Sequence, residues 1–116
     1  MRILITGLSG FAGKHLIEYL SLEGDHECFG VDLKKCSKGL DISGSSLVEE
    51  KADLSHRKEV DSIIKGFKPD QVYHLAAQSS VRQSWEDPVY TFKTNVFSGT
   101  NLLESIRQNS PHTSIL

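Results

Sequence analysis

Three glycines separated by two residues each, Gly7, Gly10 and Gly13, constrain the fold of this chain more than any other feature of its sequence. Residues 2–6 before them are mostly apolar and are typical of a buried strand. Residues 11–22 after them carry apolar side chains at helical spacing, and a glycine follows shortly after. Glycine permits a tight turn and leaves the backbone open to a bound group. The pattern therefore predicts a strand–turn–helix unit with a binding site at the turn.

The chemistry of such a turn favours a bound pyrophosphate. The first turn of a helix has unpaired N–H groups and carries the positive end of the helix dipole. Glycines without a Cβ let an anion approach these groups closely. The spacing between strand and helix therefore predicts dinucleotide binding at residues 7–13. The alternative is an ordinary strand–helix connection that happens to contain three glycines.

An acidic residue at a suitable distance supports dinucleotide binding. Asp32 ends an expected second strand, residues 27–32, and lies 19 residues after Gly13. In dinucleotide-binding folds, an acidic residue about 20 residues after the glycines holds the adenosine ribose. A carboxylate there accepts both ribose hydroxyls and repels a 2′-phosphate, which predicts NAD as the cofactor. Because Lys34 and Lys35 could neutralise such a phosphate, NADP stays open, as does an ordinary strand-end role for Asp32.

The rest of the chain alternates between strand and helix patterns. Residues 47–53 and 71–77 are expected to form strands, and another strand opens at residue 112. Residues 33–46 and 78–87 are polar and are expected to form loops. Ser55 is expected to cap a helix, the buried face of which carries Val60, Ile63, Ile64 and Phe67.

A long helix is expected between the last loop and the last strand. Asp87-Pro88 combines a capping carboxylate with a proline at the first helical position, and Pro111 follows the expected end near Asn109. One face of this helix carries Val89, Phe92, Val96, Gly99, Leu103 and Ile106. The alternation predicts an α/β fold: a Rossmann-type doubly wound parallel sheet in the order 3-2-1-4, truncated after the start of strand five. Residues 1–116 then form the N-terminal part of one NAD(P)-binding domain.

Composition excludes several classes of protein. The chain has 13 Lys and Arg against 15 Asp and Glu, a formal net charge of −2, and no broad basic field for nucleic acid. No apolar run approaches the roughly 20 residues that a membrane span needs. The first residues do not resemble a signal peptide. Cys28 and Cys36 lack the spacing of a zinc or redox pair, so a reducing, cytoplasmic setting is expected.

Several spaced motifs resemble the extended short-chain dehydrogenase/reductases, and within them the sugar-nucleotide branch of epimerases, 4,6-dehydratases and 4-keto reductases. The resemblance covers nearly the whole chain. The residues that carry it are Thr6-Gly7-Leu8-Ser9-Gly10-Phe11-Ala12-Gly13, Asp32, Asp53-Leu54, residues 73–81 from Tyr73 to Val81, Ser84, Pro88, Thr94-Asn95-Val96 and Asn101-Leu102-Leu103-Glu104.

The resemblance implies a set of contacts with NAD(P) and with a nucleotide-sugar substrate. The implied residues are Gly7, Gly10, Phe11, Ala12 and Gly13 at the pyrophosphate, Asp32 with Leu33 at the adenosine ribose, Asp53 and Leu54 at the adenine, Leu75, Ala76, Ala77 and Gln78 on the nicotinamide side, Ser79 or Ser80 near the sugar, and Asn95 as a brace between the long helix and the loop after the fourth strand. Each also has a plainer interpretation, such as tight packing for the alanines and solvation for the serines.

The chain departs from the family pattern in two places. The family usually has Gly-Thr two residues after Asn-Val, whereas Gly99 is displaced by one position after Asn95-Val96. The family also uses a Tyr-x-x-x-Lys pair for proton transfer, and no tyrosine here has a lysine four residues later. The resemblance therefore implies the cofactor-binding part of an enzyme, without catalytic residues in this chain and inactive by itself.

Other functions stay open. The resemblance implies a homodimer of the full-length protein through the long helix and its successor. A non-catalytic NAD(P)-binding sensor would keep the glycine turn and lack the Tyr-x-x-x-Lys pair, as this chain does. A nucleoside-binding enzyme of another Rossmann class, such as a methyltransferase, fits Asp53-Leu54 and Leu75-Ala76-Ala77-Gln78 poorly.

Overall fold

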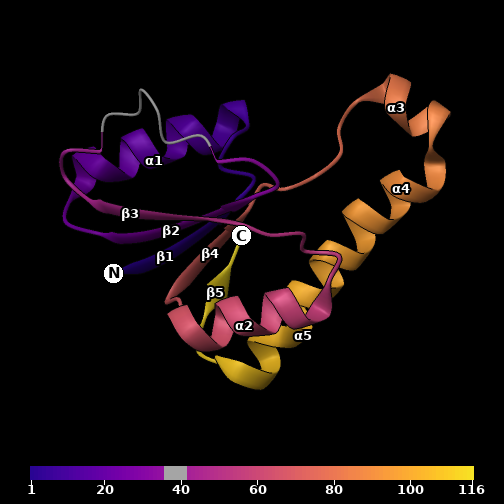
Figure 1. Cartoon of the computed structure of the whole chain (residues 1–116). Coiled ribbons are helices and arrows are strands. Elements are labelled where there is room, and N and C mark those ends of the chain that lie inside the picture. The colour runs from indigo at the N-terminus through magenta and orange to yellow at the C-terminus, as the bar shows by residue number, and fades with distance from the viewer. Residues whose placement is uncertain (36–41) are drawn as a thin grey trace.

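The computed structural model describes residues 1–35 and 42–116, so Cys36 and part of the predicted 33–46 loop lie outside it. Helices and strands alternate along most of the chain (Figure 1). In order they are β1 (Arg2–Thr6), α1 (Phe11–Glu23), β2 (Glu27–Asp32), β3 (Ser46–Lys51), α2 (Arg57–Phe67), β4 (Gln71–His74), α3 (Val81–Glu86), α4 (Pro88–Phe92), a π-helical turn η1 (Lys93–Phe97), α5 (Ser98–Asn109) and β5 (Ser114–Ile115).

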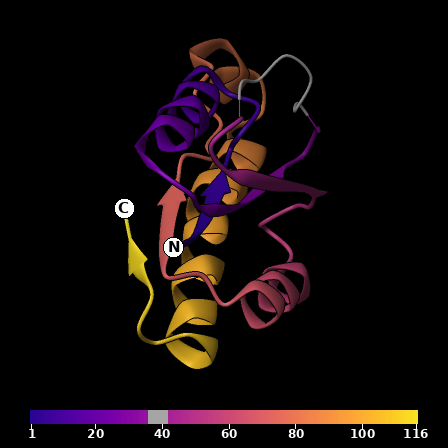
Figure 2. The same cartoon turned by 90° about the vertical axis from the view of Figure 1, so that its left-hand side faces the viewer.

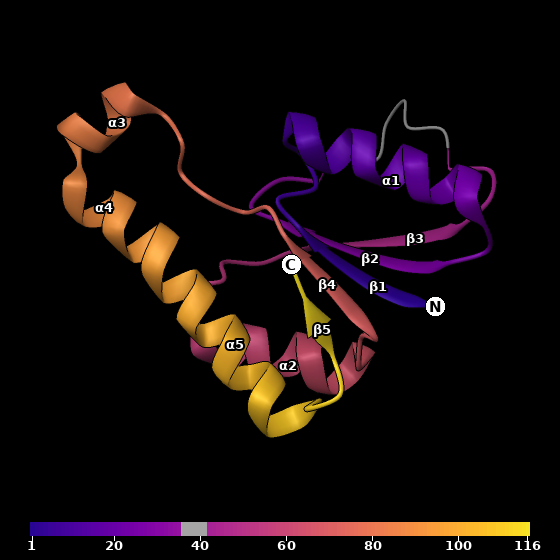
Figure 3. The same ribbon diagram turned by 180° about the vertical axis from the view of Figure 1, so that it is seen from behind.

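The described strands form one parallel sheet in the order β3-β2-β1-β4-β5. The predicted fold class and strand order are confirmed. Helix α1 covers one face, and α2 and α5 cover the other (Figure 1, Figure 3). Strand β5 pairs with β4 at the edge of the sheet (Figure 2). Because all strands are parallel, their carboxyl ends meet at one edge, where ligands of such sheets bind.

Strand β1 lies in the middle of the sheet and is buried on both faces, which explains its continuous apolar sequence. Ile3 and Ile5 pack with Ile17 of α1 on one face, in a cluster that includes Cys28. Leu4 points to the opposite face, into a cluster with residues of α2 and α5. Burial raises the pKa of the Cys28 thiol to about 11, consistent with the predicted role as a small core residue. Among the described residues, no helix is both long and apolar enough to cross a membrane.

Several predicted boundaries differ from the structure. Strand β4 ends at His74, so residues 75–77 leave the sheet and reach the carboxyl edge. Ser55 does not cap α2; its hydroxyl donates to Oδ1 of Asp53 at 2.7 Å, and His56 stands at the cap position. The predicted 78–87 loop contains the short helix α3, because Ser80 accepts a hydrogen bond from the Gln83 backbone at 3.3 Å.

The predicted helix begins where expected, with Asp87 accepting a hydrogen bond from the Tyr90 backbone at 2.9 Å. Its predicted apolar face was wrong in part, because Val89, Phe92, Val96 and Leu103 are exposed. The buried residues of α5 are Ser98, Leu102, Ser105 and Ile106, of which only Ile106 was predicted. Two small serines on this face allow α5 to pack closely on α2 and the sheet.

A π-helical turn lies just before the displaced glycine. A π turn bonds residue i to i+5 and so holds one residue more than an α turn. The extra residue falls within residues 93–97, before Gly99. Gly99 consequently lies against the sheet, where a Cβ would stand 3.7 Å from Nε2 of His74.

Candidate functional site

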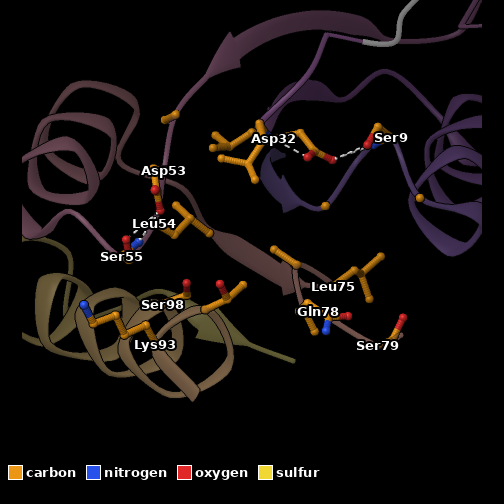
Figure 4. A pocket seen from close by; sticks show the side chains of 18 of the residues that line it. Ser9, Asp32, Asp53, Leu54, Ser55, Leu75, Gln78, Ser79, Lys93 and Ser98 are labelled. Atoms are coloured by element: carbon orange, nitrogen blue, oxygen red, sulfur yellow. Dashed lines mark hydrogen bonds between the residues drawn. The ribbon is translucent and has the colours of Figure 1, made fainter. Parts of the chain in front are cut away.

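A pocket of about 460 Å³ opens at the carboxyl edge of the sheet (Figure 4). Its lining comes from the segments that follow β1, β2, β3 and β4 and from the α4–η1–α5 helix. The lining residues are Gly7, Ser9, Gly10, Val31, Asp32, Leu33, Ala52, Asp53, Leu54, Ser55, Leu75, Ala76, Ala77, Gln78, Ser79, Ser80, Gln83, Tyr90, Lys93, Thr94 and Ser98.

The glycine turn forms one wall. Gly7 has a φ of +75°, and its N–H donates to the Val31 carbonyl at 2.9 Å. A Cβ on Gly7 would stand 2.7 Å from the Ala76 nitrogen, and one on Gly13 would stand 2.5 Å from the Gly7 carbonyl oxygen. Both glycines are therefore required by backbone packing. Gly10, at the N-cap of α1, has more room, and no side chain caps the helix there. The first N–H groups of α1 are thus available to an anion.

The Asp32 carboxylate is fixed beside this turn. Its Oδ2 accepts hydrogen bonds from the Ser9 backbone at 2.8 Å and the Ser9 hydroxyl at 2.7 Å (Figure 4). Its Oδ1 accepts from the Leu33 backbone at 2.7 Å. A carboxylate has about four lone-pair sites, so one remains for a ligand hydroxyl. Ser9 was not among the predicted site residues, although a hydroxyl residue in a turn facing a strand-end acid is a recognisable signal.

The segment after β3 holds a second carboxylate. Oδ1 of Asp53 accepts from the Ser55 backbone at 2.9 Å and from the Ser55 hydroxyl. Partial burial alone would raise the pKa of Asp53, but these hydrogen bonds and nearby His56 outweigh it and hold the pKa below its usual value. The Asn101 amide donates to the carbonyls of Leu54 and Ser55, both at 3.0 Å. Helix α5 therefore holds this segment in place.

The segment after β4 is held by the π-helical turn η1, which directly precedes α5. The Gln78 N–H donates to Oδ1 of Asn95 at 2.7 Å, and Nδ2 of Asn95 donates back to the Gln78 carbonyl at 3.0 Å. The Ala76 N–H donates to the Thr6 hydroxyl at 3.2 Å. That hydroxyl also lies 2.7 Å from Nδ1 of His74, where burial lowers the pKa of the imidazole. His74 thus has a structural contact inside the sheet.

The structure brings together most of the predicted site residues. Gly7, Gly10, Asp32, Leu33, Asp53, Leu54, Leu75, Ala76, Ala77, Gln78, Ser79 and Ser80 line the pocket. Phe11, Ala12, Gly13 and Asn95 do not. Phe11 is 82% exposed and packs its ring edge against His15. The pocket residues that the sequence reasoning missed are Ser9, Val31, Ala52, Ser55, Gln83, Tyr90, Lys93, Thr94 and Ser98. Four of these, from Tyr90 to Ser98, lie on the helix whose inner face was predicted wrongly.

Comparison with known proteins gives a consistent picture. The sequence pattern of the GDP-mannose 4,6 dehydratase family matches residues 4–115. A GDP-mannose 4,6-dehydratase of Vibrio cholerae is 32% identical over 116 residues, covering 91% of this chain and 31% of the relative. The chain thus spans about a third of the length of such relatives.

Solved structures agree with this. A UDP-glucose 4-epimerase of Thermus thermophilus in complex with NAD has a TM-score of 0.78 and 36% identity, covering 94% of this chain and 34% of that one. A UDP-glucose-4-epimerase of Stenotrophomonas maltophila, with bound NAD and formylated UDP-arabinopyranose, has a TM-score of 0.81 and 27% identity, covering 99% and 35%.

Proposed function

The chain belongs to the GDP-mannose 4,6 dehydratase family, and we propose that it forms the NAD-binding part of an enzyme acting on a nucleotide sugar. The observation that carries this proposal is the Asp32 carboxylate, held by Ser9 beside the uncapped N-terminus of α1. One site thereby offers a hydroxyl acceptor and an anion-binding helix end. The ribose and pyrophosphate of a dinucleotide require this combination.

The pocket residues fit NAD along its length. The turn at Gly7 and Gly10 would hold the pyrophosphate, because Gly10 leaves room that a larger side chain would fill. Asp32 would hold the adenosine ribose. Asp53 and Leu54 would contact the adenine, and the lowered pKa of Asp53 keeps its carboxylate an acceptor for the adenine amine.

The nicotinamide side would lie along the segment after β4. Leu75, Ala76, Ala77 and Gln78 line the pocket there, and small alanines permit close approach of the cofactor. Ser79 or Ser80 would lie nearest to the sugar. When bound, NAD supplies the hydride acceptor for oxidation of a sugar carbon, and its reduced form NADH supplies the hydride for reduction of a keto sugar. The role of this chain is to bind and orient it. We assign no catalytic residue here, because no tyrosine has a lysine four residues later.

The related structures with NAD bound support NAD as the cofactor. Nucleotide-sugar relatives, among them a GDP-6-deoxy-D-talose 4-dehydrogenase, support a nucleotide sugar as the substrate, with epimerisation, dehydration and keto reduction as the candidate reactions. The exposed apolar side chains of Val89, Phe92, Val96 and Leu103 support homodimer formation of the full-length protein through this helix. The cytoplasmic setting remains a prediction.

Calorimetric titration of the chain with NAD tests the proposal, with Gly10→Val as the comparison. A branched side chain at Gly10 would occupy the space of the pyrophosphate, so we expect this variant to fold and to lose NAD binding. Gly66→Val is a matched control, because a Cβ there meets no atom within 4 Å and Gly66 lies outside this pocket. A folded wild-type chain without affinity for NAD would refute the proposal.

One other candidate function is a non-catalytic NAD-binding sensor. Hydride transfer with a panel of nucleotide sugars distinguishes the two in the full-length protein. An enzyme converts at least one of them to a new nucleotide sugar, detected by chromatography because epimerisation and dehydration leave no net NADH, whereas a sensor binds NAD without turnover.

A further inference from the structure

The π-helical turn η1 (Lys93–Phe97) alters which side chains of the helix face the pocket. In a regular α-helix, residues five apart point about 140° away from each other. In a π turn the i and i+5 residues are hydrogen-bonded neighbours, one above the other. Lys93 and Ser98 stand in this relation, and both line the pocket. Isolated π turns occur frequently at functional sites.

Ser98 has the properties of a ligand-binding hydroxyl. The residue is only 4% exposed, and its hydroxyl has no hydrogen-bond partner among residues 1–35 and 42–116. Other buried serines of the chain are satisfied, since Ser21 donates to the Ile17 carbonyl at 2.9 Å and Ser105 accepts from the Asn109 amide at 3.3 Å. The Ser98 oxygen is not among the buried side-chain atoms that lack a partner, so it is open to the pocket and free to bond a ligand. The free hydroxyl of Ser98 lies on the pocket surface, where a ligand can reach it (Figure 4).

Lys93 adds a positive charge to the same wall. Among the described residues that line the pocket, it is the one cation, and the two anions are Asp32 and Asp53. None of the described acidic residues forms an ion pair with it. Figure 4 shows Lys93 and Ser98 on the helix, below the segment that carries Asp53, Leu54 and Ser55. Two donor side chains therefore line the pocket beside the segment assigned above to the adenine.

We propose that Lys93 and Ser98 form a second polar wall of the adenine site, donating hydrogen bonds to acceptor nitrogens of the base. This inference rests on the proposed function. Adenine has a donor amine and several ring nitrogens that only accept. The Asp53 carboxylate can accept a hydrogen bond from the amine, but it has no proton to donate to the ring nitrogens. An ammonium and a hydroxyl can donate to them. The two walls together match both kinds of group on the base.

The test measures affinity for NAD by calorimetry and for adenosine by NMR titration, in the wild type and in Lys93→Met and Ser98→Ala. Adenosine has the base and ribose but no phosphate. A neutral hydrogen bond contributes about 0.5–1.5 kcal/mol and one to a charged group about 1.5–3, so Ser98→Ala should weaken binding roughly 3–10-fold and Lys93→Met roughly 10-fold or more. For each variant the factor should be the same for both ligands. Matched controls are Lys58→Met, on α2 outside the pocket, and Ser105→Ala, buried on the same helix but outside the pocket. Both should bind NAD like the wild type.

Each other outcome has a distinct meaning. Unchanged affinity for NAD in both pocket variants would overturn the inference. Weaker binding of NAD with unchanged binding of adenosine would overturn it too, because the pair would then contact phosphate and not the base. Failure of the folded wild type to bind either ligand would instead refute the proposed function. Lys93 is exposed, so Lys93→Met keeps the test valid even if Ser98→Ala destabilises the helix.

Discussion

The hydroxyl of Ser9 donates a 2.7 Å hydrogen bond to Oδ2 of Asp32, which joins the glycine turn to the end of β2. The Ser9 backbone N–H donates a second hydrogen bond to the same oxygen at 2.8 Å. The turn that would bind the pyrophosphate and the acid that would bind the ribose are therefore fixed relative to each other without any ligand. Such pre-organisation lowers the entropic cost of binding.

Replacing Asp32 by Ala should weaken NAD binding by about 10-fold or more, because hydrogen bonds to a charged group contribute roughly 1.5–3 kcal/mol. Affinity for NADP should fall less, since the repulsion of its 2′-phosphate is also removed. The preference for NAD should thus narrow or reverse, as calorimetric titration of both cofactors would show. Ser9→Ala keeps the charge and should preserve the preference at reduced affinity. Tighter binding of NADP by the wild type would mean that Lys34 or Lys35 governs the site.

Gly13→Ala should destabilise the fold. Its Cβ would stand 2.5 Å from the Gly7 carbonyl oxygen and 2.7 Å from the Leu8 Cα, and backbone atoms cannot move away cheaply. Overpacking of this kind costs about 1–3 kcal/mol, so the thermal melting temperature should fall by several degrees. At Gly10 the nearest contact is 3.3 Å, so Gly10→Ala should melt close to the wild type. Equal melting temperatures for the two variants would contradict this account of the turn.

The centre of the sheet could be predicted from sequence because β1 and β2 are short apolar runs with most residues buried. Arg2–Thr6 and Glu27–Asp32 have the bounds expected from such runs. The carboxyl ends of four strands then place Asp32, Asp53 and the segment after β4 around one site, which needs only the topology. Ser9 and Ser55 support these acids through hydrogen bonds, which the spacing of apolar residues does not encode.

The inner face of the 88–109 helix could not be predicted in the same way. Apolar periodicity predicted that Val89, Phe92 and Val96 lie on the buried face of the helix, but all three are exposed in this chain. Periodicity shows that a helix has an apolar face, but it does not distinguish a face that packs on its own sheet from one that meets another surface. The π turn also changes the helical phase within residues 93–97, so a count at 3.6 residues per turn misplaces Lys93 relative to Ser98.

The pKa values of two histidines should be shifted in opposite directions from that of a free imidazole. Hydrogen bonding to Glu59, with Asp53 nearby, raises the pKa of His56, whereas burial lowers the pKa of His74. The His56 contact adds stability that is present below its unfolded pKa of about 6.5 and is lost as the pH rises through the folded value. For His74 the sign is reversed, since protonation favours the unfolded chain and stability falls as the pH drops through the folded value. NMR titration of both rings should give a higher pKa for His56 than for His74. Glu59→Gln should lower the pKa of His56 and leave that of His74 unchanged.

Deleting Phe97 should be tolerated, although a deletion inside a helix normally is not. A π turn holds one residue more than an α turn, so removal of one residue from η1 converts it to a regular turn. The helix on either side keeps its phase, and Lys93 and Ser98 become i and i+4 neighbours on the same face. The main loss is the edge contact between Phe92 and Phe97, whose ring centroids are 6.1 Å apart.

The control is deletion of Thr100, which lies in the α-helical part and would rotate Leu102, Ser105 and Ile106 by about 100° away from the core. Thermal melts followed by circular dichroism should show a cooperative transition near that of the wild type for the Phe97 deletion and none for the Thr100 deletion. Equal damage from both deletions would show that the π turn does not accommodate the extra residue.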